Sequence, residues 1–128
     1  MKIAVDFDGT IAKHEFPKIG EPVPLAFAWM KAFQALGAKL ILYTMRSDGQ
    51  QHGDVLTEAV EFCRRHGIEF YGINRDPDQD EWTSSPKAYA NIYIDDAAAG
   101  CPLIVNPAGR PYVDWSRVGP EVRDMLIA

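Results

Sequence analysis

The chain has 128 residues, of which 47% are hydrophobic, and its formal net charge at pH 7 is −5. This length fits one domain with a buried core, spanning residues 1–128, and the acidic balance excludes a broad basic surface for nucleic acid. No apolar run approaches the ~20 residues that a membrane helix needs. The two cysteines, Cys63 and Cys101, fit reduced core residues better than a disulfide framework, and the chain enters an apolar strand directly after Met1. We therefore expect a cytoplasmic protein with no secretory signal and no membrane partner.

Strand and helix patterns alternate through the first half of the chain. Residues 2–7 form an apolar strand, and a polar stretch with several prolines follows it. Apolar residues then recur at helical spacing from Leu25 to Leu36, which predicts an amphipathic helix that ends at Gly37. The continuous apolar run at residues 40–43 predicts a strand that is covered on both faces.

The same order of elements repeats in the second half. Asp54 is placed to cap a helix that ends at Gly67, and a strand follows at residues 68–71. The remaining predicted elements are strands at 90–94 and 103–105 and a terminal helix at 116–127. Such alternation predicts right-handed βαβ crossovers. We therefore expect an α/β fold with one doubly wound, Rossmann-like domain, a mainly parallel five-stranded sheet and helices on both faces of that sheet.

Two carboxylates follow the first strand, in the sequence Val5-Asp6-Phe7-Asp8-Gly9-Thr10. Alternate side chains of a strand point to the same side, so Asp6 and Asp8 would project together, and Gly9 allows a tight turn past them. Such a pair can hold a hard cation and supply a nucleophile and a proton donor. An ordinary Asp-Gly turn after a strand is the alternative for these residues taken alone.

Other polar residues lie where the later strands are predicted to end, which is where open parallel sheets bind ligands. Thr44 ends the second strand, with Arg46 two positions later. The pair Asp95-Asp96 ends the fourth strand, and Lys87 precedes it. Each residue alone has an ordinary alternative as a turn, a cap or a surface charge. Their convergence on one edge of the sheet favours a functional site.

Taken in order, the Asp-Phe-Asp-Gly-Thr motif, Thr44, Lys87 and Ile94-Asp95-Asp96 resemble the four-motif signature of the haloacid dehalogenase (HAD) superfamily of aspartate-nucleophile phosphohydrolases. The resemblance implies a hydrolase, namely a phosphatase that acts on phosphate monoesters. Asp6 would attack the phosphoryl group and form an aspartyl phosphate. Asp8 would protonate the leaving oxygen and then deprotonate the attacking water. Thr44 would hydrogen-bond the phosphoryl oxygens, and Lys87 would neutralise the nucleophile and the intermediate.

The resemblance also implies a metal-binding site for Mg²⁺. Its ligands would be Asp6, the backbone carbonyl of Asp8 and the pair Asp95 and Asp96, with either member of that pair as the direct ligand. A carboxylate that attacks a phosphate monoester brings two anions together, so the site needs positive charge that is fixed beforehand. Mg²⁺ and Lys87 would supply that charge.

Substrate binding is predicted from the residues around these motifs. Gly9, Thr10 and Thr44 would line the phosphate site, as the resemblance implies. Arg46 at the rim would grip a second phosphate or a carboxylate, and Trp82 would stack on a sugar or a base. The ordinary alternatives are a surface salt bridge for Arg46 and a loop tryptophan that tucks into the surface.

The chain has no room for a cap domain over the site. The two segments in which related proteins carry a cap, residues 10–24 and 74–86, are long enough only for loops. An open site either admits a large phosphorylated substrate or is covered by loops or by a neighbouring subunit of a homo-oligomer. Similar small capless proteins suggest a sugar phosphate or a polysaccharide-related phosphate by analogy.

Two other functions fit parts of the pattern. A two-component receiver domain also combines a doubly wound sheet with acidic residues, a threonine and a lysine. Its phosphoacceptor ends the third strand, however, and here that strand is followed by Asn74-Arg75 and reaches Asp76 only later. The other alternative is a non-catalytic module that binds metal and phosphate for protein interaction.

Overall fold

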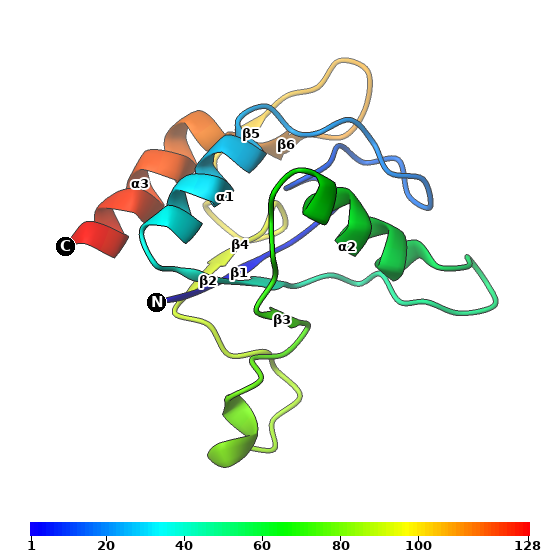
Figure 1. The fold of residues 1–128 in the computed structure, drawn as a ribbon. Helices are drawn as coiled ribbons and strands as arrows, with labels where there is room; N and C mark the ends of the chain where they lie inside the picture. The colour runs from blue at the N-terminus through cyan, green and yellow to red at the C-terminus, as the bar shows by residue number, and fades with distance from the viewer.

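A four-stranded parallel sheet is the centre of the computed structural model, which describes all residues 1–128 (Figure 1). Its strands lie in the spatial order β3 (Gly72–Ile73), β2 (Lys39–Leu42), β1 (Lys2–Val5) and β4 (Ile92–Ile94). The central strand β1 pairs in parallel with both β2 and β4. The carboxyl ends of these strands therefore meet at one edge of the sheet.

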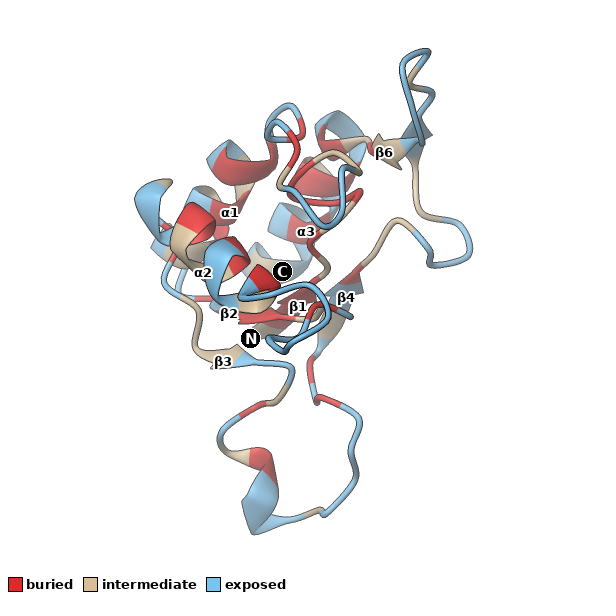
Figure 2. Ribbon diagram, turned by 90° about the vertical axis from the view of Figure 1, so that its right-hand side faces the viewer, coloured by how far each residue is buried: buried red, intermediate tan, exposed pale blue.

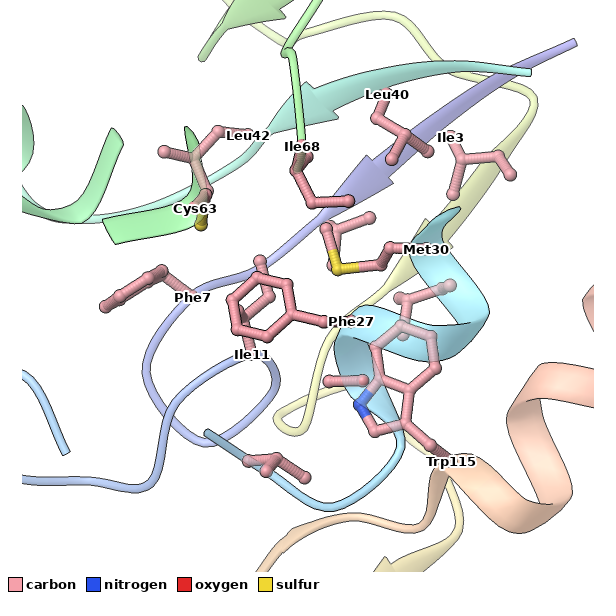
Figure 3. Close-up of a cluster of buried hydrophobic side chains, with 14 of the residues drawn as sticks. Ile3, Phe7, Ile11, Phe27, Met30, Leu40, Leu42, Cys63, Ile68 and Trp115 are labelled. Atoms are coloured by element: carbon pink, nitrogen blue, oxygen red, sulfur yellow. The ribbon is translucent and has the colours of Figure 1, made fainter. Parts of the chain in front are cut away.

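All three helices cover the same face of this sheet (Figure 2). They are α1 (Ala26–Ala35), α2 (Val55–Arg65) and α3 (Trp115–Ile127). Their apolar faces meet the strand residues that point toward them in one continuous core, which Figure 3 shows in part. The buried residues of this core include Ile3, Val5, Phe7, Ile11, Phe27, Met30, Phe33, Leu40, Leu42, Phe62, Cys63 and Trp115. None of the helices has the length and apolar character that crossing a membrane requires.

The prediction of helices on both faces is wrong for the second face. On that side the connection between β3 and β4 has no α-helix and extends away from the sheet as loops with one short 3₁₀ turn, η1 (Gln79–Glu81) (Figure 2). Polar contacts hold it: the ammonium of Lys2 donates to Asp76 at 2.7 Å, and Asp76 is 1% exposed. The buried amide of Gln79 accepts from Tyr89 N–H at 2.8 Å and donates to the carbonyl of Lys87 at 3.0 Å. Hydrogen bonds replace the apolar contacts that a packed helix would make.

The predicted fifth strand does not join the main sheet. Instead β5 (Leu103–Ile104) pairs antiparallel with β6 (Tyr112–Val113) in a separate hairpin. Only residues 95–102 separate β4 from β5, and a parallel neighbour needs a crossover of about a dozen residues or more. The prediction overlooked this length limit.

Local boundaries differ from the prediction for identifiable reasons. The helix expected at Leu25 begins one residue later, because Leu25 has a left-handed backbone with φ 70°. Ile68 lies in the turn that follows α2, where its N–H donates to the carbonyl of Cys63 at 3.0 Å. The strand predicted at 68–71 therefore forms later, as β3 at Gly72–Ile73.

The predicted cap of α2 is also wrong. Asp54 makes no capping hydrogen bond, whereas the Oδ1 atom of Asp48 accepts from the N–H groups of Leu56 at 2.8 Å and Thr57 at 3.0 Å. The loop between these residues folds back on itself, since two backbone hydrogen bonds join Gly49 and Gly53. Asp48 lies seven positions before the first residue of α2 and reaches the helix only because the loop folds back. No local sequence pattern indicates such a cap.

Helices α1 and α3 lie side by side (Figure 1). At their contact the indole of Trp29 lies against Gly119. A Cβ atom at Gly119 would overlap the ring of Trp29. We predict that Gly119→Ala destabilises the protein by about 1–3 kcal/mol through this overlap, although alanine favours a helix by about 1 kcal/mol. Urea unfolding of the two proteins measures the difference.

The control is the same change in a Trp29→Ala background, where the overlap is absent. There Gly119→Ala should be neutral or stabilising, because only the helix propensity remains. A gain in stability from Gly119→Ala in the native background would contradict the proposed tight contact.

Candidate functional site

The chain leaves β1 with its backbone still in register with both neighbours. Asp6 N–H donates to the carbonyl of Ile94 at 2.9 Å, and Tyr43 N–H donates to the carbonyl of Val5 at 2.9 Å. These bonds bring the ends of β1, β2 and β4 together. Asp6, Tyr43 and Asp95 line one common cavity there.

A tight turn follows, as the Asp-Gly sequence predicts. The carbonyl of Phe7 accepts from the N–H groups of Thr10, Ile11 and Ala12, and Gly9 has φ +86°. A Cβ atom on Gly9 would overlap the side chains of His14 and Asp96, so only glycine fits there.

The turn is also tied to the rest of the fold from behind. The buried indole N–H of Trp115 donates to the carbonyl of Thr10 at 2.8 Å, and Val113 N–H donates to the carbonyl of Gly9 at 3.0 Å. Helix α3 and the β5–β6 hairpin thus fix the position of the turn.

Three carboxylates form a cluster at this edge. One oxygen from each of Asp6, Asp95 and Asp96 lies within 4.8 Å of the others. The Thr10 hydroxyl donates to Asp6 Oδ2 at 3.0 Å and accepts from Asp96 N–H at 3.2 Å. His14 Nε2 lies 2.9 Å from Asp96 Oδ2, and Asp95 Oδ1 accepts from Ala97 N–H at 2.9 Å. Thr10 therefore orients the nucleophile candidate and one of its acidic neighbours together.

No lysine or arginine pairs with the three carboxyl groups of the cluster. Burial, followed by the neighbouring carboxyls of Asp96 and Asp95, raises the pKa of Asp6 to about 8, and the Thr10 hydrogen bond opposes this rise in part. Burial also raises the pKa of Asp95. Carboxyls that stay close without cations have raised pKa values because each anion disfavours the next. Hard oxygen donors grouped in this way suit a divalent cation such as Mg²⁺.

Asp8 is held apart from the cluster by a buried arginine. Its two oxygens accept from Arg46 Nε at 2.8 Å and Arg46 Nη2 at 2.9 Å. The same guanidinium donates to the carbonyls of Pro17 at 3.2 Å, Lys18 at 2.9 Å and Val55 at 3.1 Å. All five N–H groups of Arg46 are used, and the residue is 2% exposed.

This arrangement corrects the prediction for Arg46. It is neither a rim contact for substrate nor an exposed surface salt bridge, because it has no free donor and almost no exposed surface. Its role is to connect the first turn, the 11–20 segment and the start of α2.

Thr44 lies beside the cluster with a hydroxyl hydrogen that is free to donate. Its oxygen accepts from Arg46 N–H at 3.1 Å, and its backbone N–H donates to Asn74 Oδ1 at 2.8 Å. The backbone N–H groups of Phe7, Asp8 and Met45 donate to no acceptor in the protein. Three of these four residues, Thr44, Asp8 and Met45, line the cleft that Asp6 also lines.

A cleft of about 420 Å³ brings most of the predicted site residues together. Its lining consists of Asp6, Asp8, His14, Phe16, Thr44, Met45, Arg46, Asp95, Asp96, Ala97 and Arg110. No cap covers it, and Met45 at its edge is 98% exposed.

Lys87 and Trp82 do not lie in this cleft. They line a separate cavity with Tyr89 and Tyr93, and the Lys87 ammonium is 5.2 Å from the centroid of the Tyr93 ring. Trp82 packs edge-on against Tyr89 with ring centroids 5.3 Å apart. The β3–β4 connection that carries both residues follows the second face of the sheet and does not bring them to the carboxylates.

Sequence reasoning missed Arg110 as a residue of the cleft. Its position depends on the β5–β6 hairpin, which was not predicted. The glycine-containing turn before Tyr112, Pro107-Ala108-Gly109, is the local signal that would have indicated a hairpin.

Comparisons with known proteins give one informative match. No protein-family model matches the chain, and no curated protein does either. A solved structure of a conserved protein from Bacteroides thetaiotaomicron matches with a TM-score of 0.74 and 38% sequence identity, over 98% of this chain and 91% of that chain. Identity at this level over nearly the full length of both chains shows common ancestry, and this chain belongs to the same protein family as that conserved Bacteroides thetaiotaomicron protein.

Proposed function

We propose that this protein is a magnesium-dependent phosphatase of the HAD superfamily, which hydrolyses phosphate monoesters through an aspartyl phosphate on Asp6. One observation carries the proposal: Asp6, Asp95 and Asp96 cluster beside Thr44, while Arg46 holds Asp8 separately in the same cleft. This combination offers a cation site, a nucleophile, a hydrogen-bond donor to the phosphoryl group and a group that carries a proton. The free cysteines Cys63 and Cys101 are consistent with a cytoplasmic location.

The topology supports a ligand site at this place. In the strand order β3-β2-β1-β4, the direction of winding reverses between β1 and β4. Ligands of open α/β sheets bind at such a reversal, outside the carboxyl ends of the strands. Asp6 follows β1 and Asp95 follows β4, so the carboxylates lie at that point. We interpret the sheet as a reduced Rossmann-like core on this basis.

The residues present fit a magnesium ion. Asp6, Asp95 and Asp96 would hold it, and the carbonyl oxygen of Asp8, which accepts no hydrogen bond in the protein, would complete the protein ligands. When bound, the ion would supply positive charge against the developing negative charge on the phosphoryl oxygens. A cation in the cluster also favours the ionised form of Asp6, which is the nucleophilic form.

The first step forms a covalent bond to Asp6. Thr10 engages Oδ2 of Asp6, which leaves Oδ1 to attack phosphorus. The bond between phosphorus and the leaving oxygen breaks, and Asp8 gives that oxygen a proton. The Thr44 hydroxyl and the free N–H groups of Asp8 and Met45, three residues that line the cleft, would donate to the phosphoryl oxygens.

The second step returns the enzyme to its starting state. A water molecule attacks phosphorus of the aspartyl phosphate, Asp8 accepts its proton, and phosphate leaves as the Asp6 carboxylate is restored. The Nε and Nη2 groups of Arg46, which we call the Arg46 fork, donate to both oxygens of Asp8 and so fix the plane of its carboxylate. The carboxylate has further lone pairs that the fork does not occupy. One edge of Asp8 thus remains available to the cleft, where its side chain is 19% exposed.

Lys87 has no part in this proposal, since its ammonium lies over Tyr93 in a separate cavity. A receiver domain is also disfavoured by the structure. The residue after β3 is Asn74, whose side chain accepts from Thr44 N–H, so no carboxylate occupies the place of a phosphoacceptor.

The proposal predicts hydrolysis of 4-nitrophenyl phosphate that requires Mg²⁺ and stops with chelator. Asp6→Asn should lower kcat by at least about 10³-fold, because the amide cannot attack phosphorus. Release of 4-nitrophenolate measures both effects. Beryllium fluoride should form an adduct on Asp6 that a structure of the treated protein would reveal.

Two outcomes would contradict this prediction. Full activity of Asp6→Asn, or an adduct on a different aspartate, would reject Asp6 as the nucleophile. If calorimetry detects Mg²⁺ binding and no phosphate ester in a broad panel is hydrolysed, the protein is a binding module.

The buried Arg46 fork should not tolerate lysine. A lysine ammonium has three donors and no planar fork, so Arg46→Lys would leave two of five acceptors unpaired. We expect a loss of about 2–4 kcal/mol in unfolding free energy, together with a lower kcat because Asp8 loses its orientation. Urea unfolding and steady-state kinetics measure the two effects.

Arg75→Lys is the matched control, because Arg75 makes a half-exposed ion pair with Asp80 far from the cleft. Its effect should stay within about 0.5 kcal/mol. Equal losses for the two variants would mean that the Arg46 contacts are no stronger than a surface pair.

The raised pKa of Asp6 predicts a pH-dependent response to metal. Asp6 has a pKa of about 3.9 in the unfolded chain and about 8 in the metal-free folded protein. Between these two pH values the Asp6 carboxyl is protonated in the folded state and ionised in the unfolded state. The stability of the metal-free folded state therefore falls as the pH rises through this range. Mg²⁺ needs the ionised carboxylates, so the stabilisation by Mg²⁺ should grow over the same range. Thermal unfolding from pH 5 to pH 8, with Mg²⁺ or with chelator, measures both trends.

The Asp6→Asn variant isolates the contribution of this one group. In this variant the stabilisation by Mg²⁺, measured as the difference in thermal unfolding with Mg²⁺ and with chelator, should lose the part of its pH dependence that comes from Asp6. If the wild type gains the same stabilisation from Mg²⁺ at pH 5 and pH 8, Asp6 is not a metal ligand with a raised pKa.

A further inference from the structure

Arg110 extends the cleft beyond the carboxylates. It lines the cleft that contains Asp6, and it also lines an adjoining cavity of about 430 Å³ with His14, Glu15 and Phe16. His14, Phe16 and Arg110 belong to both cavities, so the two form one continuous groove. A bound molecule whose phosphoryl group is at Asp6 has a direct path toward Arg110.

The backbone that carries Arg110 is tied to the phosphoryl site. Arg110 lies in the connection between β5 and β6, three residues before Val113, whose N–H donates to the carbonyl of Gly9 at 3.0 Å. The turn before it is closed by a bond from Gly109 N–H to the carbonyl of Asn106 at 3.1 Å. The ammonium of Lys13 also lies 5.2 Å from the centroid of the Tyr112 ring. The hairpin therefore holds Arg110 at a defined place relative to the Asp6–Gly9 turn.

The guanidinium of Arg110 has no partner in the protein. It makes no hydrogen bond and no ion pair, and of the three arginines without a carboxylate partner, Arg65, Arg110 and Arg117, it is the one that lines the cleft. An unpaired arginine that faces an acidic cleft can offer its planar fork to a ligand oxyanion. The acidic cluster would itself be occupied by metal and phosphate during the proposed reaction, so Arg110 remains free for a second group.

We propose that Arg110 binds a second oxyanion, a carboxylate or a phosphate, on the leaving group of the substrate. The inference rests on the proposed function and adds its substrate class: phosphate monoesters with a second negative charge at the far end of the leaving group. The open rim then selects substrates by charge, while the phosphoryl site treats all monoesters alike.

A matched set of aryl esters tests the inference. Phenyl phosphate carries no second anion, 4-carboxyphenyl phosphate adds a carboxylate and benzene-1,4-diyl bisphosphate adds a phosphate. In the wild type, one or both of the esters that carry a second anionic group should have a KM at least about fivefold lower than that of phenyl phosphate. Arg110→Gln should abolish this preference and leave kcat/KM for phenyl phosphate unchanged, and 0.5 M salt should weaken it.

Arg117→Gln is the matched control, because Arg117 is also exposed, makes no side-chain hydrogen bond and lies on α3 outside the groove. It removes the same charge and should keep the preference. Arg110→Lys should keep part of it. If the carboxylate ester alone is favoured, the second anion is a carboxylate, and if the bisphosphate alone is favoured, it is a phosphate.

The inference and the proposed function fail in different ways. Hydrolysis of all three esters with equal KM in wild type and Arg110→Gln would overturn the inference and leave the phosphatase intact. Without hydrolysis, calorimetry with phenylphosphonate and 4-phosphonobenzoate still tests Arg110, because the preference must then appear in binding. No preference there overturns the inference as well.

Discussion

The buried guanidinium of Arg46 is the interaction on which the candidate site depends. Its five donors reach the Asp8 carboxylate, the carbonyls of Pro17 and Lys18, and the carbonyl of Val55 at the start of α2. Three segments that are distant in sequence are thereby fixed to one planar group. A buried charge is tolerated only when its partners satisfy it fully, and here none of its N–H groups is left over. The position of Asp8 in the cleft follows from these contacts.

The fork also divides the four carboxylates into two environments. Asp8 is paired with a cation, whereas Asp6, Asp95 and Asp96 face one another, and none of them pairs with a lysine or an arginine. The second arrangement costs folding stability, which the raised pKa of Asp6 reports. Proteins keep such repulsive groups where a ligand relieves the repulsion. The two environments correspond to the two tasks of the proposed reaction, proton transfer and cation-assisted attack.

The sequence predicts the central part of this site because short-range patterns determine it. Apolar runs identify β1, β2 and β4, and the residues that follow them, Asp6, Thr44 and Asp95, meet because parallel strands end at one edge. The contacts of Arg46 could not be predicted, since its partners come from three loops whose paths depend on tertiary packing. The same holds for Asp48, which caps α2 only because a loop folds back on it.

The prediction failed most on the second face of the sheet, where an α/β pattern suggests a helix. The segment after β3 instead places charged and amide side chains under the strands, with Lys2 donating to Asp76 and Asp78, and these bonds raise the pKa of Lys2. Polar anchoring of this kind has no periodicity, so hydrophobic patterns cannot detect it.

The polar second face also affects the cleft. Asn74, at the start of the same connection, accepts from Thr44 N–H and so positions the hydroxyl beside Asp6. The connection that departs from the expected helix therefore supports the edge at which the proposed chemistry occurs. Its own aromatic residues, Trp82 and Tyr89, stay on that face and leave the rim of the cleft to the β5–β6 hairpin. In the proposed reaction, substrate selection and phosphoryl transfer would take place at opposite ends of one groove, and both ends are fixed to the Asp6–Gly9 turn.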